Sequence, residues 1–227
     1  MVAFVGGGGK TTALFALAAH RPGATVVTTT TKMGRDRTGG LPVLISPTDA
    51  EVARTLGDRG SAIVWAAADE QRAIGVDRAD CARYLDLADT VAVEADGSRR
   101  RPFKAPLDYE PVVPPATTVL VACCGMAAVG VPIDEGCHRP ERVAALTGAS
   151  PGDPLTPERL VQVLMSSDGS MKDRPAGARY AVLLNRIRPE HAGVVDEIRE
   201  RVAATDPDVP VLAIDDMAAS ELPDHVG

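Results

Sequence analysis

The residues best suited to chemistry form a glycine-rich segment near the start of this 227-residue chain. It reads Gly6-Gly7-Gly8-Gly9-Lys10-Thr11-Thr12, between the apolar run Val2–Val5 and a helix-length apolar stretch. Glycines let backbone N–H groups approach phosphate oxygens, and the following helix N-terminus adds the positive end of its dipole. A lysine here can reach the β- and γ-phosphates, and the first threonine can ligate Mg²⁺. We therefore predict that residues 6–12 bind ATP, or another nucleoside triphosphate, with Mg²⁺.

This loop is shorter than the usual phosphate-binding motif. The usual spacing puts its first glycine five positions before the one that precedes the lysine, and Phe4 holds that position here. The remaining G-x-x-G-K-T pattern resembles the ATP loop of the Mur ligase and folylpolyglutamate synthetase families, where G-T-x-G-K-T-T recurs. The alternative is a flexible glycine turn with an incidental Lys-Thr. The order of strand, glycines, lysine, threonines and helix favours the phosphate loop.

Two carboxylates follow a second apolar run, Thr90–Glu94. Glu94 and Asp96 stand two positions apart, so a continuing strand would present both on one side. An acidic residue at such a strand end holds Mg²⁺ in nucleotide hydrolases, directly or through water. The sequence therefore predicts a metal site made of Thr11, Glu94 and Asp96.

A basic stretch begins three residues later with Arg99 and continues to Lys104. Such a stretch could neutralise a transferred phosphate or a small anionic substrate, and its alternative is a solvated loop. Its place directly after the acidic strand end favours the first interpretation. The candidate catalytic residues are Lys10, Glu94, Asp96 and Lys104.

Three further residues are candidates for binding the nucleotide or its substrate. Lys32 follows four threonines at the end of another apolar run, where open α/β sheets bind ligands. His138 and Arg139 stand at a helix start, which suits an anion. Cys123 and Cys124 end a predicted strand, and the sequence leaves open whether they pack or react.

The elements that must position these residues are strands alternating with helices. The predicted strands are Val2–Val5, Thr25–Thr29, Pro42–Ile45, Ala62–Ala66, Thr90–Glu94, Thr118–Cys123, Tyr180–Leu184 and Pro210–Ile214. The predicted helices are Lys10–His20, Thr48–Leu56, Asp80–Leu87, Pro140–Leu146, Pro157–Met165 and Glu190–Ala203. Most of the strands lack polar alternation, as in sheets that are covered on both faces. We expect an α/β fold of the P-loop NTPase type, with a mostly parallel sheet and helices on both faces. Residues 1–227 should form one domain with a long loop at about 97–116.

Composition and charge exclude several classes of protein. The net charge is −7, the pI is near 5.1 and only 3% of residues are aromatic, which argues against nucleic-acid partners. The four cysteines have neither zinc-ribbon nor disulfide-scaffold spacing. The uncharged stretch Pro111–Ile133 holds four prolines, so we interpret it as loop, strand and loop rather than a membrane span. A soluble, cytoplasmic protein without a signal peptide is expected.

Taken together, the motifs resemble those of the YqeC family. The matching segments include 4–12, 27–33, 93–106 and 110–114, with His138-Arg-Pro-Glu141 and Leu183-Leu-Asn-Arg186 further on. This resemblance implies an accessory role beside selenium-dependent molybdenum hydroxylases or in the synthesis of their cofactor.

The chain departs from that family in one motif. Members tend to read Leu-Asn-Lys-x-Asp, which suggests guanine recognition, whereas this chain reads Leu184-Asn-Arg-Ile-Arg188. The missing aspartate favours ATP or leaves the base unread.

Three functions remain open from the sequence. The leading hypothesis is an ATP-dependent enzyme, of the ATPase, ligase or kinase type, that serves hydroxylase maturation. The second is a nucleotide-gated chaperone for the cofactor or the client hydroxylase, with little turnover. The third is a small-molecule kinase. The second substrate is not specified.

Overall fold

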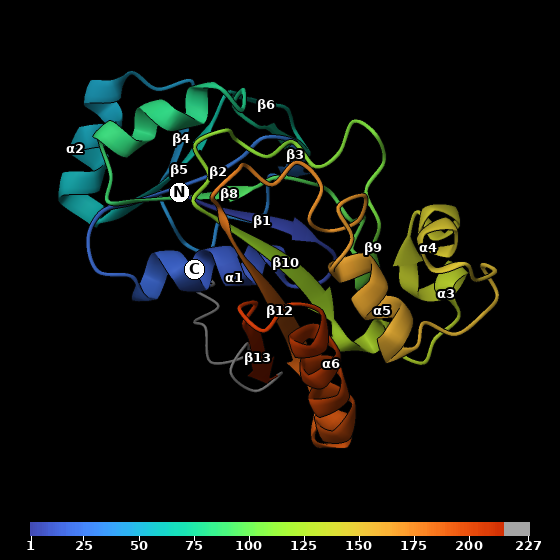
Figure 1. Cartoon of the computed structure of the whole chain (residues 1–227). Helices are drawn as coiled ribbons and strands as arrows, with labels where there is room; N and C mark the ends of the chain where they lie inside the picture. Colours follow the sequence, from blue (N-terminus) through green and yellow to red (C-terminus); the bar gives the residue numbers. More distant parts are fainter. Residues whose placement is uncertain (216–227) are drawn as a thin grey trace.

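A computed structural model describes residues 1–215, and its central feature is one large sheet (Figure 1). Its strands are β1 Val2–Gly6, β2 Thr25–Thr29, β4 Val43–Ile45, β5 Ser61–Trp65, β8 Thr90–Glu94, β10 Val119–Gly125, β12 Arg179–Ile187 and β13 Val211–Asp215. They lie in the order β13-β12-β10-β1-β8-β2-β5-β4. Every neighbouring pair is parallel. All eight strands predicted from the sequence form this sheet, which confirms the α/β class.

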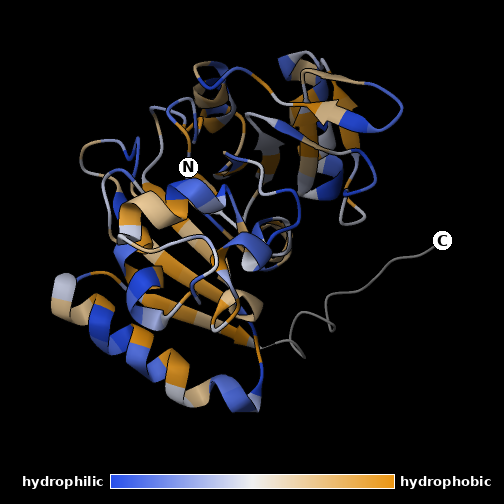
Figure 2. Cartoon of the chain, turned by 90° about the vertical axis from the view of Figure 1, so that its right-hand side faces the viewer, coloured by the Kyte–Doolittle hydropathy of each residue, from blue (hydrophilic) through white to orange (hydrophobic). Residues whose placement is uncertain are grey.

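The sheet is covered on both faces, as the uninterrupted apolar runs predicted. All residues of β2, β5 and β8 are buried, including the threonines. Figure 2 shows hydrophobic colours along much of the large sheet and mixed colours on the helices around it. A strand that buries both faces needs no polar alternation, so the uninterrupted apolar run was the signal that identified these strands.

The helices are α1 Lys10–His20, α2 Asp49–Arg59, α3 Ile133–Gly136, α4 Pro140–Thr147, α5 Pro157–Leu164 and α6 Ala192–Thr205. One face of the sheet carries α1, whose Leu14 belongs to a core cluster with Phe4 and Val27. Residues of α2 pack on β2, β5 and β8 from the opposite face. Residues of α5 and α6 pack on β1, β10 and β12 from that same opposite face.

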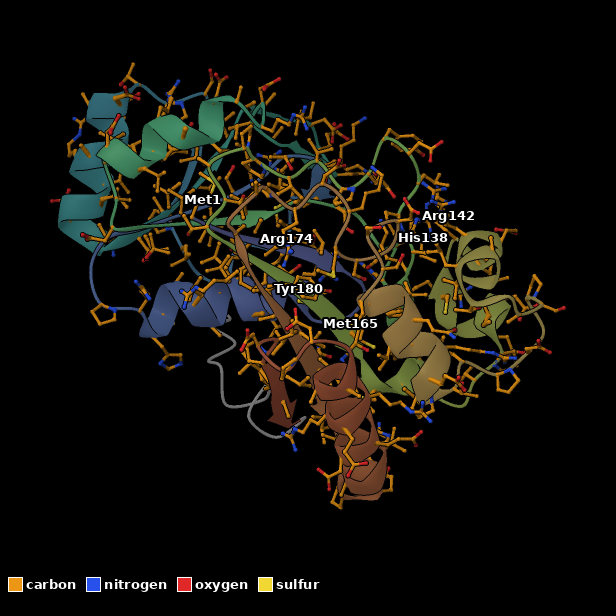
Figure 3. All side chains as sticks on the ribbon, in the orientation of Figure 1. Met1, His138, Arg142, Met165, Arg174 and Tyr180 are labelled. Carbon is orange, nitrogen blue, oxygen red and sulfur yellow. The ribbon has the colours of Figure 1, made fainter. Side chains whose placement is uncertain are left out.

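Helix starts follow the sequence signals. Thr48 caps α2 in a capping box with Glu51, whose backbone N–H donates to the threonine and whose carboxylate accepts from the Thr48 N–H. Pro140 and Pro157 occupy the first turns of α4 and α5. At the other end of α5, the Leu164 carbonyl accepts a 2.6 Å hydrogen bond from the Tyr180 hydroxyl of β12 (Figure 3).

Two predicted helices differ in the structure. The segment predicted as helix Asp80–Leu87 is a 3₁₀ helix, Asp80–Asp86, that buries only Cys81 and Tyr84. These side chains are three apart and eclipse one another in the tighter helix, so one short stripe reaches the core. The helix predicted over Glu190–Ala203 is a 3₁₀ turn, Pro189–His191, followed by α6.

Two small sheets were not predicted. An antiparallel one joins β3 Lys32–Gly34, β7 Arg72–Ile74 and β6 Ala67–Ala68. A parallel pair joins β9 Phe103–Lys104 and β11 Cys137–His138. The predicted loop at about 97–116 therefore contains a strand. Strands of two or three residues have too few positions for alternation to be visible in the sequence.

The topology brings the predicted motifs to one edge of the sheet. Phe4 of β1 is in register with Glu94 of β8, and Gly6 is in register with Cys123 of β10. Gly125, at the end of β10, is in register with Asn185 of β12. Because all these strands are parallel, their carboxyl ends meet at the same edge, where open α/β sheets bind ligands.

None of the helices within residues 1–215 has both the length and the apolar character needed to cross a membrane. The last twelve residues of the predicted single domain, 216–227, lie outside the described part of the chain, and the domain prediction stays a prediction.

Candidate functional site

The glycine loop makes a tight turn between β1 and α1. Gly6, Gly8 and Gly9 have φ values of 93°, 65° and 84°, a region that favours glycine. The Gly7 N–H donates to the Cys123 carbonyl at 3.0 Å. A Cβ on Gly7 would lie 2.7 Å from the backbone of Phe103, so only glycine fits there. All four glycines thus fit the loop against its neighbours, and Gly8 and Gly9 also line a large cavity.

Asn185 holds the second half of this loop. Its Nδ2 donates a 2.6 Å hydrogen bond to the Gly8 carbonyl, across 177 positions of sequence. A Cβ on Gly9 would overlap the Asn185 side chain, so any side chain at position 9 would displace Asn185 from the loop. The Oδ1 of Asn185 is buried and has no hydrogen-bond partner among the described residues. Buried acceptors without a partner are rare, so this atom marks a place beside the loop where a ligand N–H or a water molecule would donate.

Lys10 and Asp96 form a buried ion pair beneath the loop. Lys10 Nζ lies 3.0 Å from Asp96 Oδ1 and donates to the Gly6 carbonyl at 2.5 Å. The other carboxylate oxygen of Asp96 accepts from the Gly6 N–H at 2.9 Å and lies 3.3 Å from Lys104 Nζ. Burial works to lower the pKa of Lys10, but the charges of Asp96 and Glu94 outweigh it and raise that pKa. Lys10 therefore keeps its positive charge.

Lys104 extends this network away from the loop. It is 1% exposed and donates to the Gly97 carbonyl and to Glu110 Oε2, both at 2.8 Å. With Asp96 and Glu110 on either side, its ammonium is fully engaged in holding the segment after β8. Lys104 lines neither of the large cavities described below, so the geometry favours a structural role over the predicted catalytic one.

Thr11 and Glu94 meet on the open side of the loop. The Thr11 hydroxyl donates a 2.9 Å hydrogen bond to Glu94 Oε2. These two oxygen donors come from the first turn of α1 and from the end of the adjacent strand β8. Asp96, in contrast, is directed to the two lysines. The structure thus brings two of the three predicted metal ligands together and separates the third.

A large cavity opens on this side. It has a volume of about 850 Å³ and is bordered by half of the predicted site residues. Predicted residues that line it are Gly8, Gly9, Lys10, Thr11, Lys32, Glu94 and Arg99. Arg37, Arg72, Arg100 and Arg186 line it too. Arg100 belongs to the predicted basic stretch, whereas nothing in the sequence predicted that Arg37, Arg72 and Arg186 would converge on the same cavity.

A second cavity lies on the other side of Gly9. It has a volume of about 430 Å³, and its lining includes Thr12, Asn185, Arg188 and His191. The two cavities share Gly9, Ala127 and Arg186. A ligand could therefore pass continuously over the glycine loop from one cavity to the other. Among the described residues, no carboxylate lines this second cavity.

His138 and Arg139 lie apart from both cavities. Figure 3 places His138 at the end of the molecule that carries α3 and α4. Burial, then the charges of Arg139 and Lys104, lower the pKa of His138 to about 4. Arg139 donates to the Tyr109 hydroxyl at 3.0 Å and lies 3.8 Å from Glu110 Oε1. Neither residue lines either cavity, and the Arg139 guanidinium contacts Tyr109 and Glu110 instead. His138 is neutral near pH 7, so it offers no positive charge to an anion.

The four cysteines are free and buried. Burial raises the pKa of both Cys123 and Cys137 to about 12 and that of Cys124 further. A thiol with such a pKa stays protonated at neutral pH and is a poor nucleophile. The packing interpretation of Cys123 and Cys124 is therefore favoured. Within residues 1–215, no group of three or more His, Cys, Asp or Glu side chains could hold a metal ion.

Comparison with known proteins agrees with this arrangement of motifs. The chain is 34% identical over 99 residues to an uncharacterized protein named YqeC from Escherichia coli strain K12. That alignment covers 43% of this chain and 39% of the relative, so the chain is matched to well under half of that protein. No solved structure matches the chain significantly. The family model described as YqeC protein matches residues 2–141, which is more than half of the chain and includes the glycine loop, Lys32 and Glu94. The chain therefore belongs to the YqeC family.

Proposed function

We propose that this protein has a P-loop NTPase-like fold and binds a nucleoside triphosphate, ATP in preference to GTP, with Mg²⁺ at the glycine loop. One observation carries the proposal. The central strand β1 runs through the glycine turn into α1, and Thr11 of that helix contacts Glu94 from the neighbouring strand at 2.9 Å. Strand, turn, lysine, hydroxyl and acidic strand end are the parts that P-loop proteins use around a phosphate chain.

The two cavities suggest how the nucleotide lies. The phosphates would pass over Gly8 and Gly9, where backbone curvature and the start of α1 favour negative charge. The nucleoside would occupy the cavity of about 430 Å³, which Asn185 and its unpartnered Oδ1 border. The γ-phosphate would face the larger cavity and its cations.

Lys10 suits the role of phosphate ligand despite its burial. An ammonium has three N–H donors, and two are directed to the Gly6 carbonyl and Asp96. The third remains for a phosphate oxygen, because Lys10 lines the larger cavity. Asp96 holds the ammonium in place and keeps it charged, so we assign it a positioning role.

Thr11 and Glu94 fit an Mg²⁺ ion. Mg²⁺ takes oxygen ligands and is commonly held by one or two protein groups together with substrate phosphates and water. When bound, Mg²⁺ would offset the negative charge that develops on the β- and γ-phosphate oxygens. Glu94 would supply the carboxylate, and Asp96 would not.

The reaction that this arrangement supports is attack on the γ-phosphorus. The attacking oxygen belongs to water or to an acceptor, and the bond to the β–γ bridging oxygen breaks as the nucleoside diphosphate leaves. Lys10 would stabilise the charge on the leaving phosphate. The cationic wall of the larger cavity favours a small anionic acceptor, so a small-molecule kinase is the second candidate.

The client is proposed from the family resemblance of the motifs. On that basis the nucleotide reaction serves maturation of selenium-dependent molybdenum hydroxylases or their cofactor. Turnover that rises when the client hydroxylase is added would support this role. A stoichiometric phosphorylated small molecule formed without the client would support the kinase instead.

Nucleotide binding is tested with Lys10→Ala. We expect the variant to lose at least about tenfold in affinity for a fluorescent ATP analogue with Mg²⁺, because the Lys10 ammonium is the charge that the loop itself holds beside the proposed phosphates. Arg54→Ala, on the exposed side of α2, is the matched control and should bind as the wild type does. Circular dichroism would verify that both variants fold. Equal affinity and equal turnover in Lys10→Ala would refute the nucleotide site.

A further inference from the structure

The larger cavity gathers more positive charge than a nucleotide at the glycine loop requires. Seven cationic side chains line it: Lys10, Lys32, Arg37, Arg72, Arg99, Arg100 and Arg186. Only two carboxylates, Asp36 and Glu94, accompany them. This concentration occurs in a chain whose net charge is −7. The local excess of cations thus runs against the overall charge of the molecule.

Three of these cations come from the region of the small antiparallel sheet, on the wall opposite the glycine loop. In β3 and β7, Met33 and Ala73 are in register and buried in the core. Alternation places Lys32 and Arg72 together on the opposite, outer face. Gly34 is in register with Arg72, and a Cβ on Gly34 would lie 2.5 Å from Asp36 Oδ1 and 3.8 Å from Arg37 Cδ. The absence of a side chain at Gly34 thus leaves room for the Asp36 carboxylate and the stem of Arg37.

These cations have no direct ion-pair partner within residues 1–214, although the carboxylates of Asp36 and Asp69 lie near them. Neither Lys32, Arg37 nor Arg72 forms an ion pair with any carboxylate in residues 1–214. Asp69 is near enough for the charges of Lys32 and Arg72 to help lower its pKa, but its carboxylate is directed mainly at backbone N–H groups of the β6–β7 turn. Like charges on one sheet face repel each other, and a bound anion would relieve this cost.

The facing wall is built from arginines in an unusual backbone conformation. Arg99, Arg100 and Arg186 have φ values of 49°, 65° and 55°. Residues other than glycine rarely adopt this region, and such positions concentrate at ligand sites, where surrounding structure maintains them. The two arginines of the loop after β8 and the one at the end of β12 thereby border the same cavity.

We propose that the wall formed by Lys32, Arg37 and Arg72 binds a small molecule carrying a dianionic group, such as a phosphate ester or a dicarboxylate. Guanidinium groups match the planar pairs of oxygens that these anions present. The inference rests on the proposed function, since it places this molecule opposite the γ-phosphate of a nucleotide at Gly8–Thr11. A cavity of about 850 Å³ is large enough for both the terminal phosphates and a second small ligand.

The test uses the full chain saturated with a non-hydrolysable ATP analogue and Mg²⁺, so that the glycine loop is filled. Glycerol 3-phosphate and malate are titrated separately by calorimetry, which distinguishes a phosphate ester from a dicarboxylate. The variant is Arg37→Gln with Arg72→Gln, both exposed. The matched control is Arg54→Gln with Arg59→Gln on α2, which removes the same charge far from the cavity.

We expect the wild type to bind at least one of the two probes. The Arg37→Gln, Arg72→Gln variant should bind it at least about tenfold more weakly, because two charge-assisted contacts are lost. Affinity for the ATP analogue should stay within about twofold of the wild type, and the α2 control should behave as the wild type in both titrations.

Three results would overturn the inference: the wild type binds neither probe, the double variant binds as the wild type does, or its affinity for the ATP analogue falls as much as that for the probe. The last result would mean that these arginines serve the nucleotide itself. If the wild type fails to bind the ATP analogue, the proposed function is wrong. In that case, glycerol 3-phosphate and malate are titrated into the nucleotide-free protein. Comparing the Arg37→Gln, Arg72→Gln variant with the α2 control then tests the wall formed by Lys32, Arg37 and Arg72 by itself.

Discussion

At the scale of single residues, the two carboxylates after β8 have different surroundings. Among the described residues, the Glu94 carboxylate accepts a hydrogen bond only from the Thr11 hydroxyl, and Glu94 borders the larger cavity. Asp96 is 2% exposed and contacts Lys10, Lys104 and the Gly6 N–H. A buried carboxylate between two buried ammonium groups maintains local structure, because its loss would leave both cations without their anion. The sequence pattern made the two residues look equivalent, and the contacts separate them.

The first prediction compares Glu94→Gln with Asp96→Asn. Asp96→Asn should lower the free energy of unfolding by about 3 kcal/mol, because a buried ion network loses its anion. Glu94→Gln should change it by less than about 1 kcal/mol, because only one hydrogen bond is affected. Turnover of Glu94→Gln should lose its dependence on Mg²⁺ concentration. Chemical denaturation and an Mg²⁺ titration of turnover measure these effects. A wild-type Mg²⁺ curve in Glu94→Gln would remove Glu94 from the metal site.

The second prediction concerns His138, whose pKa is lowered to about 4 from an ordinary value near 6.5. The unfolded chain therefore binds a proton on this residue at a higher pH than the folded chain does. Stability contributed by the neutral imidazole is present above pH 6.5 and is lost as the pH falls towards 4. We expect His138→Gln to lack this pH-dependent loss of stability, because glutamine does not bind a proton in this range.

Denaturant midpoints at pH 7.5 and pH 5.0 measure the effect. The midpoint should fall further for the wild type than for His138→Gln over this interval. His20→Gln, on the exposed surface of α1, serves as the control and should show the wild-type fall. An identical fall in His138→Gln and the wild type would contradict the lowered pKa.

At the scale of elements, the site depends on how β12 supports the turn between β1 and α1. Asn185 reaches the Gly8 carbonyl only because β10 lies between β1 and β12 and sets the distance between them. Gly9 then has both a left-handed backbone and a side-chain neighbour that leaves no room for a Cβ. The loop conformation is thus a property of three strands rather than of the glycines alone.

The third prediction follows from this contact. Gly9→Ala should destabilise the fold by more than about 1 kcal/mol, because φ is 84° and the new Cβ would overlap Asn185. It should also weaken ATP binding. Gly57→Ala is the matched control, because Gly57 lies inside α2 with nothing within 4 Å of a Cβ. That control should stabilise the fold by about 0.5–1 kcal/mol. Thermal denaturation decides it, and equal stability of Gly9→Ala and the wild type would refute the tight contact.

At the scale of the whole molecule, the glycine loop lies between two cavities with different linings. The larger one has seven cationic side chains, whereas the smaller one combines Arg186 and Arg188 with Asn185 and the apolar side chains of Leu183 and Ile214. A molecule with an anionic chain and a ring system that is partly apolar matches these linings. The residues that line the two cavities come from six strands and their loops, so no single segment of the sequence reveals the site.

The fourth prediction concerns the base. Guanine recognition commonly requires a carboxylate that accepts its ring N–H and amino group, and none lines the smaller cavity within the described residues. Arg188, at the position of the expected aspartate, lines it instead. We therefore expect ATP to bind at least as tightly as GTP. Competition of both nucleotides against a fluorescent ATP analogue measures this. Clear preference for GTP would show that the base lies elsewhere.

Sequence alone was sufficient for the eight strands of the large sheet and for the place of the glycine loop within it. Fully buried strands such as Thr25–Thr29 and Thr90–Glu94 are short runs rich in valine and threonine. Such a run can be recognised from its own five residues, without knowledge of the strands beside it. The capping box at Thr48 and the proline starts of α4 and α5 are also local, so they were predictable. The candidate residues Lys10, Thr11 and Glu94 follow from motifs that lie within a few residues of a strand end.

Only the tertiary structure decided which charged side chains share a space. Arg72 and Arg37 come to the cavity through a three-stranded sheet too short to predict, and Asn185 reaches Gly8 from 177 positions away. Lys104 and Asp96 are buried together although their sequence context resembles an open loop. The physical reason is that strand pairing and burial depend on distant partners. A sequence therefore specifies the local elements of this protein more directly than the electrostatic surroundings of each of its charges.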